Sequence, residues 1–269
     1  MESLEILYYG FHGSASMSGI FFTTTQNHKI MQTPHYNYTP DDKMITLISD
    51  NYRMIQVMSR FGIKVGFGDK TVAEVCEEHN VDCMTFLAVV NFVSNPNDSS
   101  TFHLNEISIR SILQYLRSSH IYFLDYLLPE IRRKLLDGIR FRTSDVSILI
   151  LKFFDEYSFE VRTHMEYEEN HVFDYVHRLL DGIADPNFKI STYSDHHEEV
   201  TSKLRELKTL IIRYCPESAD VNLLNAALFD ICQCKQELDS HSKVENMIFI
   251  PAIEALETKI SSREGCNPQ

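Results

Sequence analysis

The sequence predicts an all-α fold, an up-down-up-down four-helix bundle preceded by a small helical domain. Four long segments in the second part of the chain place apolar residues three and four positions apart, which is the pattern of a helix with one buried face. Glycine and proline are scarce, at 9 and 8 of 269 residues, and this scarcity favours helix over a turn-rich β architecture. Because four helices joined by short connections pack as antiparallel neighbours, the pattern indicates a bundle.

Composition and charge exclude several classes of protein. The chain has 25 Lys and Arg against 38 Asp and Glu, a formal charge of −13, so a broad nucleic-acid-binding surface is not expected. Its apolar runs are far shorter than the roughly 20 residues of a membrane span. No Lys or Arg precedes Lys29, and the six cysteines lack paired zinc spacing. We therefore expect a cytoplasmic protein with reduced thiols that binds neither nucleic acid nor membrane.

The first part of the chain predicts an extension and a small domain. We expect residues 1–38 to form a flexible extension, with Met31 as an alternative start, and residues 39–94 to form the small helical domain. Helix-like stretches cover about 41–61, 71–80 and 81–93. Two aspartates can cap the first stretch, and the second opens with capping-box spacing. These residues are Asp41 and Asp42, then Thr71 and Glu74.

The bundle is predicted over residues 102–260, after a turn-forming linker at 94–101 and before a tail at 261–269. Its four long segments run at about 106–139, 144–180, 195–213 and 219–257. The breaks between them are RFRTS, DPNFKIST and CPES.

Polar residues interrupt the four apolar stripes in a repeated pattern. Each stripe carries one inward histidine, and the second and fourth add a glutamate four residues later, one turn along the same face. The same interval of 44 residues separates the first histidine from the second and the third from the fourth. The six residues are His120, His164, Glu168, His197, His241 and Glu245.

Burial of these six groups without a partner would cost several kcal/mol for each charge. A metal removes that cost. Imidazole nitrogen and carboxylate oxygen suit iron or manganese, and a carboxylate can bridge two ions. A lone buried histidine is usually structural, but the joint pattern predicts a dinuclear metal site with positions left open for a small ligand.

The remaining histidines, cysteines and acids are interpreted as structural or exposed. We expect His103, His171 and His177 to lie outside the site and the Cys232–Cys234 pair to be buried in the ordinary way. The acidic runs at 166–169 and 198–199 are interpreted as solvated faces, apart from Glu168. Glu160, one turn before His164, is a candidate for an access path.

At these residues the sequence resembles the haemerythrin-like cation-binding fold, and more closely the iron–sulfur cluster repair di-iron proteins, the "repair of iron centres" or ScdA-type family. The resemblance implies two iron ions in a non-haem di-iron centre bridged by carboxylate and oxo groups and held by the six residues. Residues 60–78 resemble the small N-terminal ScdA-type domain of that family. The matching bundle motifs are HIYFLDYLLP from His120, HMEYEE from His164, HEE from His197 and HSKVENMIFIP from His241.

Two departures qualify the resemblance. Val65 to Gly68 stand where the family commonly has Cys-Cys-Gly-Gly, so a role that depends on that thiol pair is in doubt, although Cys76 matches the family's later cysteine. Oxygen-carrying haemerythrins have a further histidine where this chain has Thr201, and they end with an aspartate at a five-residue spacing. One imidazole fewer favours reactivity or metal release over reversible storage of dioxygen.

The resemblance implies a stress-response protein that repairs or protects iron–sulfur clusters of client proteins, by iron donation or nitric oxide chemistry. A second hypothesis is a sensor that binds nitric oxide or dioxygen without turnover and uses the small domain as its partner surface. A third is a bundle without metal that serves as an interaction protein. The residues do not choose between iron donation, nitric oxide reduction and sensing, so enzymatic activity stays open.

Overall fold

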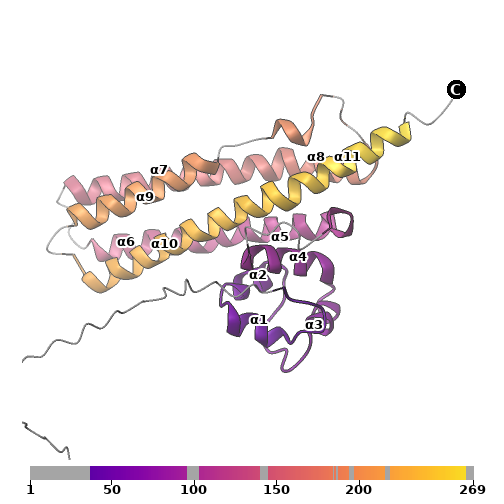
Figure 1. Ribbon diagram of the computed structural model, residues 1–269. Helices are drawn as coiled ribbons and strands as arrows, with labels where there is room; N and C mark the ends of the chain where they lie inside the picture. The colour runs from indigo at the N-terminus through magenta and orange to yellow at the C-terminus, as the bar shows by residue number, and fades with distance from the viewer. Residues whose placement is uncertain are drawn as a thin grey trace, which may run out of the picture. The chain divides into compact units, whose positions relative to one another are not determined.

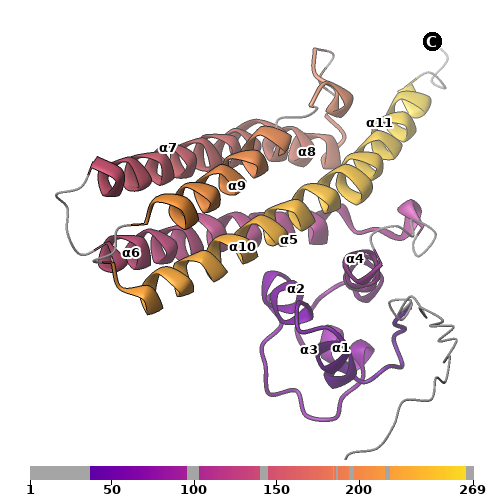
Figure 2. The same ribbon diagram turned by 60° about the vertical axis from the view of Figure 1, so that its left-hand side comes forward.

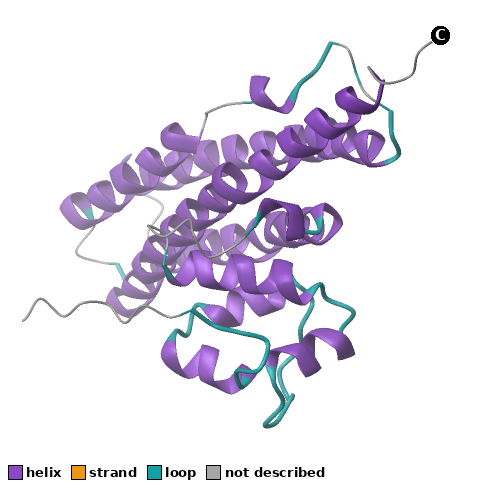
Figure 3. Ribbon diagram, turned by 45° about the vertical axis from the view of Figure 1, so that its right-hand side comes forward, coloured by secondary structure: helices purple, strands orange, loops and turns teal. Residues whose placement is uncertain are grey.

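The computed structural model describes residues 37–95, 103–139, 145–183, 185, 187–193, 197–215 and 219–264, without the side chains of 197–202 and 263–264. These residues are helices and connecting loops (Figure 3) and contain no strand beyond one isolated antiparallel bridge between Lys43 and Thr71. They belong to one compact unit, His35–Gln269. The predicted all-α class is confirmed, whereas the predicted extension lies almost wholly outside the described residues.

Four short helices form the N-terminal part of this unit (Figure 1). The stretch expected as one helix over 41–61 divides in two, because the backbone is extended at Asn51. The described residues before it are also folded, since Tyr38 is buried and its backbone N–H donates to Asn91 Oδ1 at 2.8 Å. The helices are α1 (Met44–Asp50), α2 (Met54–Arg60), α3 (Val72–Glu78) and α4 (Cys83–Ser94).

One of the two expected helix caps is present. Thr71 and Glu74 form a complete capping box at the start of α3. The expectation for Asp42 was wrong: α1 begins after Lys43 with no side-chain cap, and the Asp42 carboxylate accepts instead from Thr39. The reason lies in the tertiary structure, because the backbone N–H of Met44 donates to the Lys70 carbonyl at 3.0 Å.

In the described part of the chain, the bundle consists of four long helical segments, three of which contain a π-helical turn. Figures 1 and 2 show these segments lying side by side. Short 3-10 turns, η2 (Leu104–Glu106) and η5 (Ile190–Thr192), precede the first and third segments. The fourth segment extends to Glu264, into the stretch expected as a tail. In order, the segments are α5 (Ile109–Ile121), η3 (Tyr122–Leu127) and α6 (Leu128–Gly138); α7 (Asp145–Tyr167), η4 (Glu168–Val172) and α8 (Phe173–Leu180); α9 (His197–Tyr214); and α10 (Val221–Val244), η6 (Glu245–Phe249) and α11 (Ile250–Glu264).

The π turns lie at one level of the bundle, beside the predicted ligands. Turn η4 begins at Glu168, η6 begins at Glu245, and η3 begins two residues after His120. In the first and fourth segments a proline, Pro129 or Pro251, is the second residue of the helix that resumes. Proline cannot donate to the carbonyl four residues earlier and crowds it, so a widened turn before it is favourable.

Two hydrophobic cores occupy the two ends of the bundle. The proximal core contains the buried residues of α1–α4 together with those of α5, α8 and α11, and the distal core contains those of α6, α9 and most of α7 and α10. Segments one and three pass from the proximal to the distal core, and segments two and four return, so the up-down-up-down order is confirmed. Along each segment, the change from one core to the other falls between two buried residues. From the first segment to the fourth, these pairs are Leu116 and Phe123, Met165 and Val172, Ile190 and Leu204, and Leu238 and Val244.

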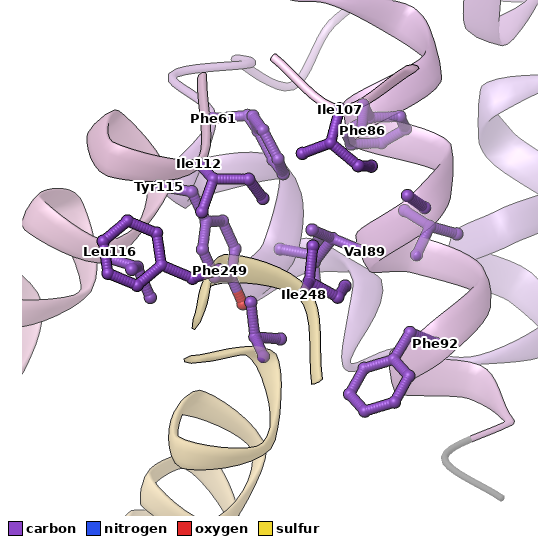
Figure 4. Close-up of a cluster of buried hydrophobic side chains, with 14 of the residues drawn as sticks. Phe61, Phe86, Val89, Phe92, Ile107, Ile112, Tyr115, Leu116, Ile248 and Phe249 are labelled. Atoms are coloured by element: carbon purple, nitrogen blue, oxygen red, sulfur yellow. The ribbon is translucent and has the colours of Figure 1, made fainter. Parts of the chain in front are cut away.

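The N-terminal helices share the proximal core with the bundle. Figure 4 shows Phe61, Phe86 and Val89 beside Tyr115 of α5 and Phe249 of the fourth segment. All five side chains are buried. Removal of this much apolar surface from water is the main attraction between the two parts.

A buried ion pair also joins the N-terminal helices to the bundle. Arg60 Nη2 of α2 lies 2.7 Å from Glu237 Oε2 of α10, and both side chains are at most 6% exposed. The Arg60 guanidinium also lies over the rings of Tyr115, Tyr122 and Phe123, at 5.4 to 5.8 Å from their centroids. Glu237 stands one turn before His241 on the same helix, so this pair adjoins the predicted site.

Candidate metal centre

A layer of polar side chains separates the proximal and distal cores. His120, Glu168, His241 and Glu245 come from three bundle segments and are each at most 2% exposed. Each offers a ligand atom, and these atoms all lie within 4.8 Å of one another. The sequence predicts that the alternating chain direction places all six candidate ligands at one level of the bundle. The structure brings these four of the six together.

The first of the two other predicted ligands lies beside this four-residue cluster. His164 of α7 has a side chain that is 17% exposed, and its Nε2 lies 3.0 Å from Glu168 Oε1. The spacing of four along one helix accounts for this contact. His197 is the first residue of α9, and its side chain lies outside the described residues. In the sequence it stands between Ile190 of the proximal core and Leu204 of the distal core.

Two imidazole–carboxylate pairs form the closest contacts of the cluster. His120 Nδ1 donates to Glu169 Oε1 at 3.0 Å, and His120 Nε2 lies 3.0 Å from Glu168 Oε2. His241 Nε2 likewise lies 3.2 Å from Glu245 Oε1. A cation, either a proton or a metal ion, can bind between the nitrogen and the oxygen of each pair.

The buried imidazole nitrogens are a further indication that the cluster binds a metal ion. His120 Nε2 and both ring nitrogens of His241 are buried without a hydrogen-bond partner of acceptable geometry. Buried polar atoms in folded proteins normally have a hydrogen-bond partner, so buried nitrogens without one indicate that a ligand can bind there. Nitrogen and oxygen donors with no thiolate fit iron or manganese. The residues present therefore fit a metal ion.

The charges of the cluster also favour a cation. Burial lowers the pKa of His241, which keeps that imidazole neutral. Burial acts in the same direction on His120, but the carboxylates of Glu168 and Glu169 outweigh it and raise its pKa to about 9. The carboxylates thus stabilise positive charge at His120 in a site that is otherwise short of it.

Glu169 was wrongly interpreted as part of a solvated face. Its carboxylate accepts from His120 and from Arg117 Nε, the latter at 2.9 Å. Burial alone would raise the pKa of Glu169, and these two partners lower it. Glu169 lies in the π turn that begins at Glu168, and its carboxylate reaches Nδ1 of His120, the ring nitrogen that does not contact Glu168. The second glutamate of the HxxxEE motif was the signal that could have found it.

Tyr193 is a second residue of the site that the sequence analysis missed. It follows η5 in the connection between α8 and α9, and its hydroxyl donates to Glu168 Oε1. Burial and the carboxylates of Glu245 and Glu168 raise its pKa, so it keeps its proton. No helical periodicity extends through this connection, so no pattern in the sequence pointed to it.

Most of the residues assigned to structural roles lie away from the site. His103 and His171 are exposed, His177 is half-buried, and Glu160 forms an ion pair with Lys203. Cys234 is buried as expected, but Cys232 is exposed, because residues two positions apart on an α-helix face nearly opposite sides. Cys76, Cys83, Cys232 and Cys234 are free thiols, and burial raises the pKa of Cys76, which keeps it protonated.

No described helix has the length and apolarity needed to cross a membrane.

Comparison with known proteins identifies the family of the bundle. No curated protein matches the sequence significantly. A family model described as the hemerythrin HHE cation binding domain matches residues 111–253, which include all six predicted ligands and leave out the N-terminal helices. Because this match covers more than half of the 269 residues, the chain belongs to the hemerythrin HHE cation-binding domain family.

Proposed function

We propose that this protein holds a non-haem di-iron centre between the two cores of its bundle. The observation that carries the proposal is the pair of buried imidazole–carboxylate contacts, His120 with Glu168 and His241 with Glu245, whose ligand atoms all lie within 4.8 Å of one another. His164 and His197 complete the proposed ligand set, the latter from its place in the sequence. Two symmetric halves, each with a His-xxx-Glu pair and a further histidine, suit two ions rather than one.

The protein's own residues orient and shield the ions. Bound ferrous ions supply Lewis acidity and electrons to a small ligand such as nitric oxide or dioxygen. Glu168 and Glu245 provide the carboxylates that can span two ions, and Glu169 fixes the orientation of His120 through Nδ1. The two cores exclude water from above and below, which strengthens electrostatic interactions at the centre.

We further propose that the centre serves repair or protection of iron–sulfur clusters in client proteins under nitrosative or oxidative stress. The support is the resemblance of the four bundle motifs to the repair family. The N-terminal thiols do not add to it: the Cys-Cys pair of that family is replaced by Val65 and Gly66, and Cys76 is buried. Donation of labile iron, or nitric oxide chemistry at the centre, is therefore the proposed route, rather than thiol exchange.

Metal analysis tests the proposed centre directly. The protein is purified without chelator, reconstituted anaerobically with ferrous iron, and freed of loosely bound metal. We expect close to two iron ions per chain. A chain that retains no iron, or that prefers zinc to iron under competition, contradicts the proposal. Transfer of this iron to a cluster-depleted acceptor protein then tests the repair role, and a loaded protein that restores no cluster contradicts that role alone.

One observation favours a sensor as the second candidate function. The buried Arg60–Glu237 pair connects α2 to the helix that carries His241, one turn from that ligand. A change in the centre that moves α10 would thus reach the N-terminal helices. Hydrogen exchange of α1–α4 with and without nitric oxide on the loaded protein tests this candidate: a change in exchange without ligand turnover supports sensing, and unchanged exchange contradicts it.

A further inference from the structure

Among the described residues, Tyr193 is the tyrosine whose hydroxyl group donates to the carboxylate of a proposed metal ligand. It comes from the connection between α8 and α9, and its hydroxyl donates to Glu168 Oε1. The same oxygen lies 3.0 Å from His164 Nε2, and the other oxygen of Glu168 lies 3.0 Å from His120 Nε2. Both oxygens of this carboxylate are therefore held, one of them by a phenol.

The connection has a second anchor besides Tyr193. Glu257 Oε1 of α11 accepts from the backbone N–H of Ile190 at 2.8 Å and also from the hydroxyl of Tyr175 in α8 at 2.6 Å. The ring of Tyr193 lies nearly parallel to that of Tyr167, with an angle of 17° and centroids 6.4 Å apart. Tyr167 immediately precedes Glu168, so this contact holds the phenol over the carboxylate.

Tyr193 also connects Glu168 to the third bundle segment. It stands four residues before His197, where α9 begins. A hydrogen bond from this position links a carboxylate of the second segment to the start of the segment that carries the remaining proposed ligand. Outer-shell donors of this kind fix the orientation of a ligating carboxylate and strengthen metal binding through it.

We propose that Tyr193 is a positioning residue of the metal centre, which orients the Glu168 carboxylate for metal binding through its hydroxyl group. This inference rests on the proposed metal-binding function. It adds to the centre a residue from outside the helical repeat.

Replacement of the hydroxyl tests the inference. Tyr193→Phe removes the donor and retains the ring, and Tyr175→Phe is the matched control, because it removes a phenol–carboxylate hydrogen bond to Glu257 in the same region of the bundle. Cobalt(II) is the probe, since its visible spectrum reports on the geometry of its ligands, and its affinity is measured by competition with a chelator. We expect Tyr193→Phe to weaken cobalt binding about tenfold or more and to change the visible spectrum of bound cobalt. Tyr175→Phe should retain the wild-type affinity and the wild-type spectrum.

The outcomes separate this inference from the proposed function. Wild-type protein that binds no cobalt contradicts both. Wild-type binding with an unchanged affinity and spectrum in Tyr193→Phe contradicts the role of Tyr193 alone. An equal loss in both variants also contradicts it, because the effect would then belong to the connection as a whole.

A second measurement does not depend on how well the variant folds. In wild-type protein labelled with ¹³C in its tyrosine rings, addition of cobalt should shift or broaden the Tyr193 signal far more than the Tyr175 signal. In metal-free protein, Glu168→Gln should shift the Tyr193 signal and leave that of Tyr175 in place. A Tyr193 signal that responds to neither change overturns the inference.

Discussion

His120 shows how one residue combines a core position with a site position. Its ring stacks on Phe173 at 5.5 Å between centroids, while its two nitrogens point to Glu168 and Glu169. The stacking fixes the plane of the imidazole, and the hydrogen bond to Glu169 keeps a proton on Nδ1. Nε2 is thereby the nitrogen that a metal ion can bind in place of a proton.

Loss of either cluster carboxylate should lower iron loading. Glu168→Ala and Glu245→Ala each remove a buried anionic ligand, so we expect iron content after reconstitution to fall to less than half of the wild-type value. Glu166→Ala and His171→Ala are the controls, because both residues are exposed on the same segment. Equal iron in all four variants would refute the ligand assignment.

Removal of the charge on Glu169 should weaken metal binding without removing a ligand. Glu169→Gln retains the shape but withdraws the carboxylate that orients His120, so we expect affinity to fall by roughly 10-fold, the lower end of the usual range for outer-shell partners. Chelator competition with ferrous iron or cobalt measures the change. Since Arg117 shares this carboxylate, Arg117→Gln should have a smaller effect in the same direction; a larger effect would show that Glu169 acts mainly by charge balance.

At the scale of elements, the π turns decide how three segments present their ligands. Turns η4 and η6 begin at Glu168 and Glu245 themselves. A π turn gives up regular hydrogen bonding, and such turns persist mostly where function requires the altered geometry. The prolines after η3 and η6 favour the widened turn, but η4 forms without one, so proline is not a requirement.

The Arg60–Glu237 pair should contribute strongly to the attachment of α2 to α10. Arg60→Ala leaves the Glu237 carboxylate buried and unpaired, and we expect the free energy of unfolding to fall by about 3–5 kcal/mol. Arg132→Ala is the control, because Arg132 pairs with Asp155 at the same 2.7 Å distance but on the surface; its loss should cost about 1 kcal/mol or less. Chemical denaturation measures both changes.

A double substitution separates pairing from charge burial. Arg60→Met with Glu237→Leu replaces both charges by apolar groups of similar size, and we expect it to recover most of the stability that Arg60→Ala loses. If the double variant is as unstable as Arg60→Ala, then the contacts of the guanidinium with the rings of Tyr115, Tyr122 and Phe123 are the larger contribution.

At the scale of the whole molecule, the metal centre separates two cores that would otherwise meet. Each core is apolar, and the polar layer between them contains buried nitrogen atoms that lack hydrogen-bond partners. The metal-free protein bears the free-energy cost of these groups, and the unfolded chain does not. Metal binding should therefore stabilise the fold as well as complete the site.

Metal loading should raise the thermal stability of the protein. At a free metal concentration 100 times the dissociation constant, linkage predicts about 2.7 kcal/mol of added stability, which corresponds to an increase in Tm of roughly 5–10 °C for a domain of this size. Calorimetry of metal-free and loaded protein measures it. Glu168→Ala should show no such increase, and an equal increase in that variant would place the stabilising metal elsewhere.

The sequence by itself determined the all-α class, the four bundle segments and the level at which their polar residues meet. It could do so because helical periodicity is local: a residue's face on its helix depends only on its spacing from its neighbours. The spacing of His164 and Glu168, and of His241 and Glu245, therefore placed each pair on one face. The alternation of chain direction then followed from the short connections.

Only the tertiary structure decided the surroundings of these residues. The break between α1 and α2, the backbone pairing that replaces the Asp42 cap, and the burial of Arg60 against Glu237 all depend on partners distant in the chain. Glu169 belongs to the site because its carboxylate accepts from His120 of another segment, and Tyr193 belongs because its hydroxyl, in an aperiodic connection, donates to Glu168. Periodicity cannot report such contacts, since they arise from packing between elements and not from spacing within one.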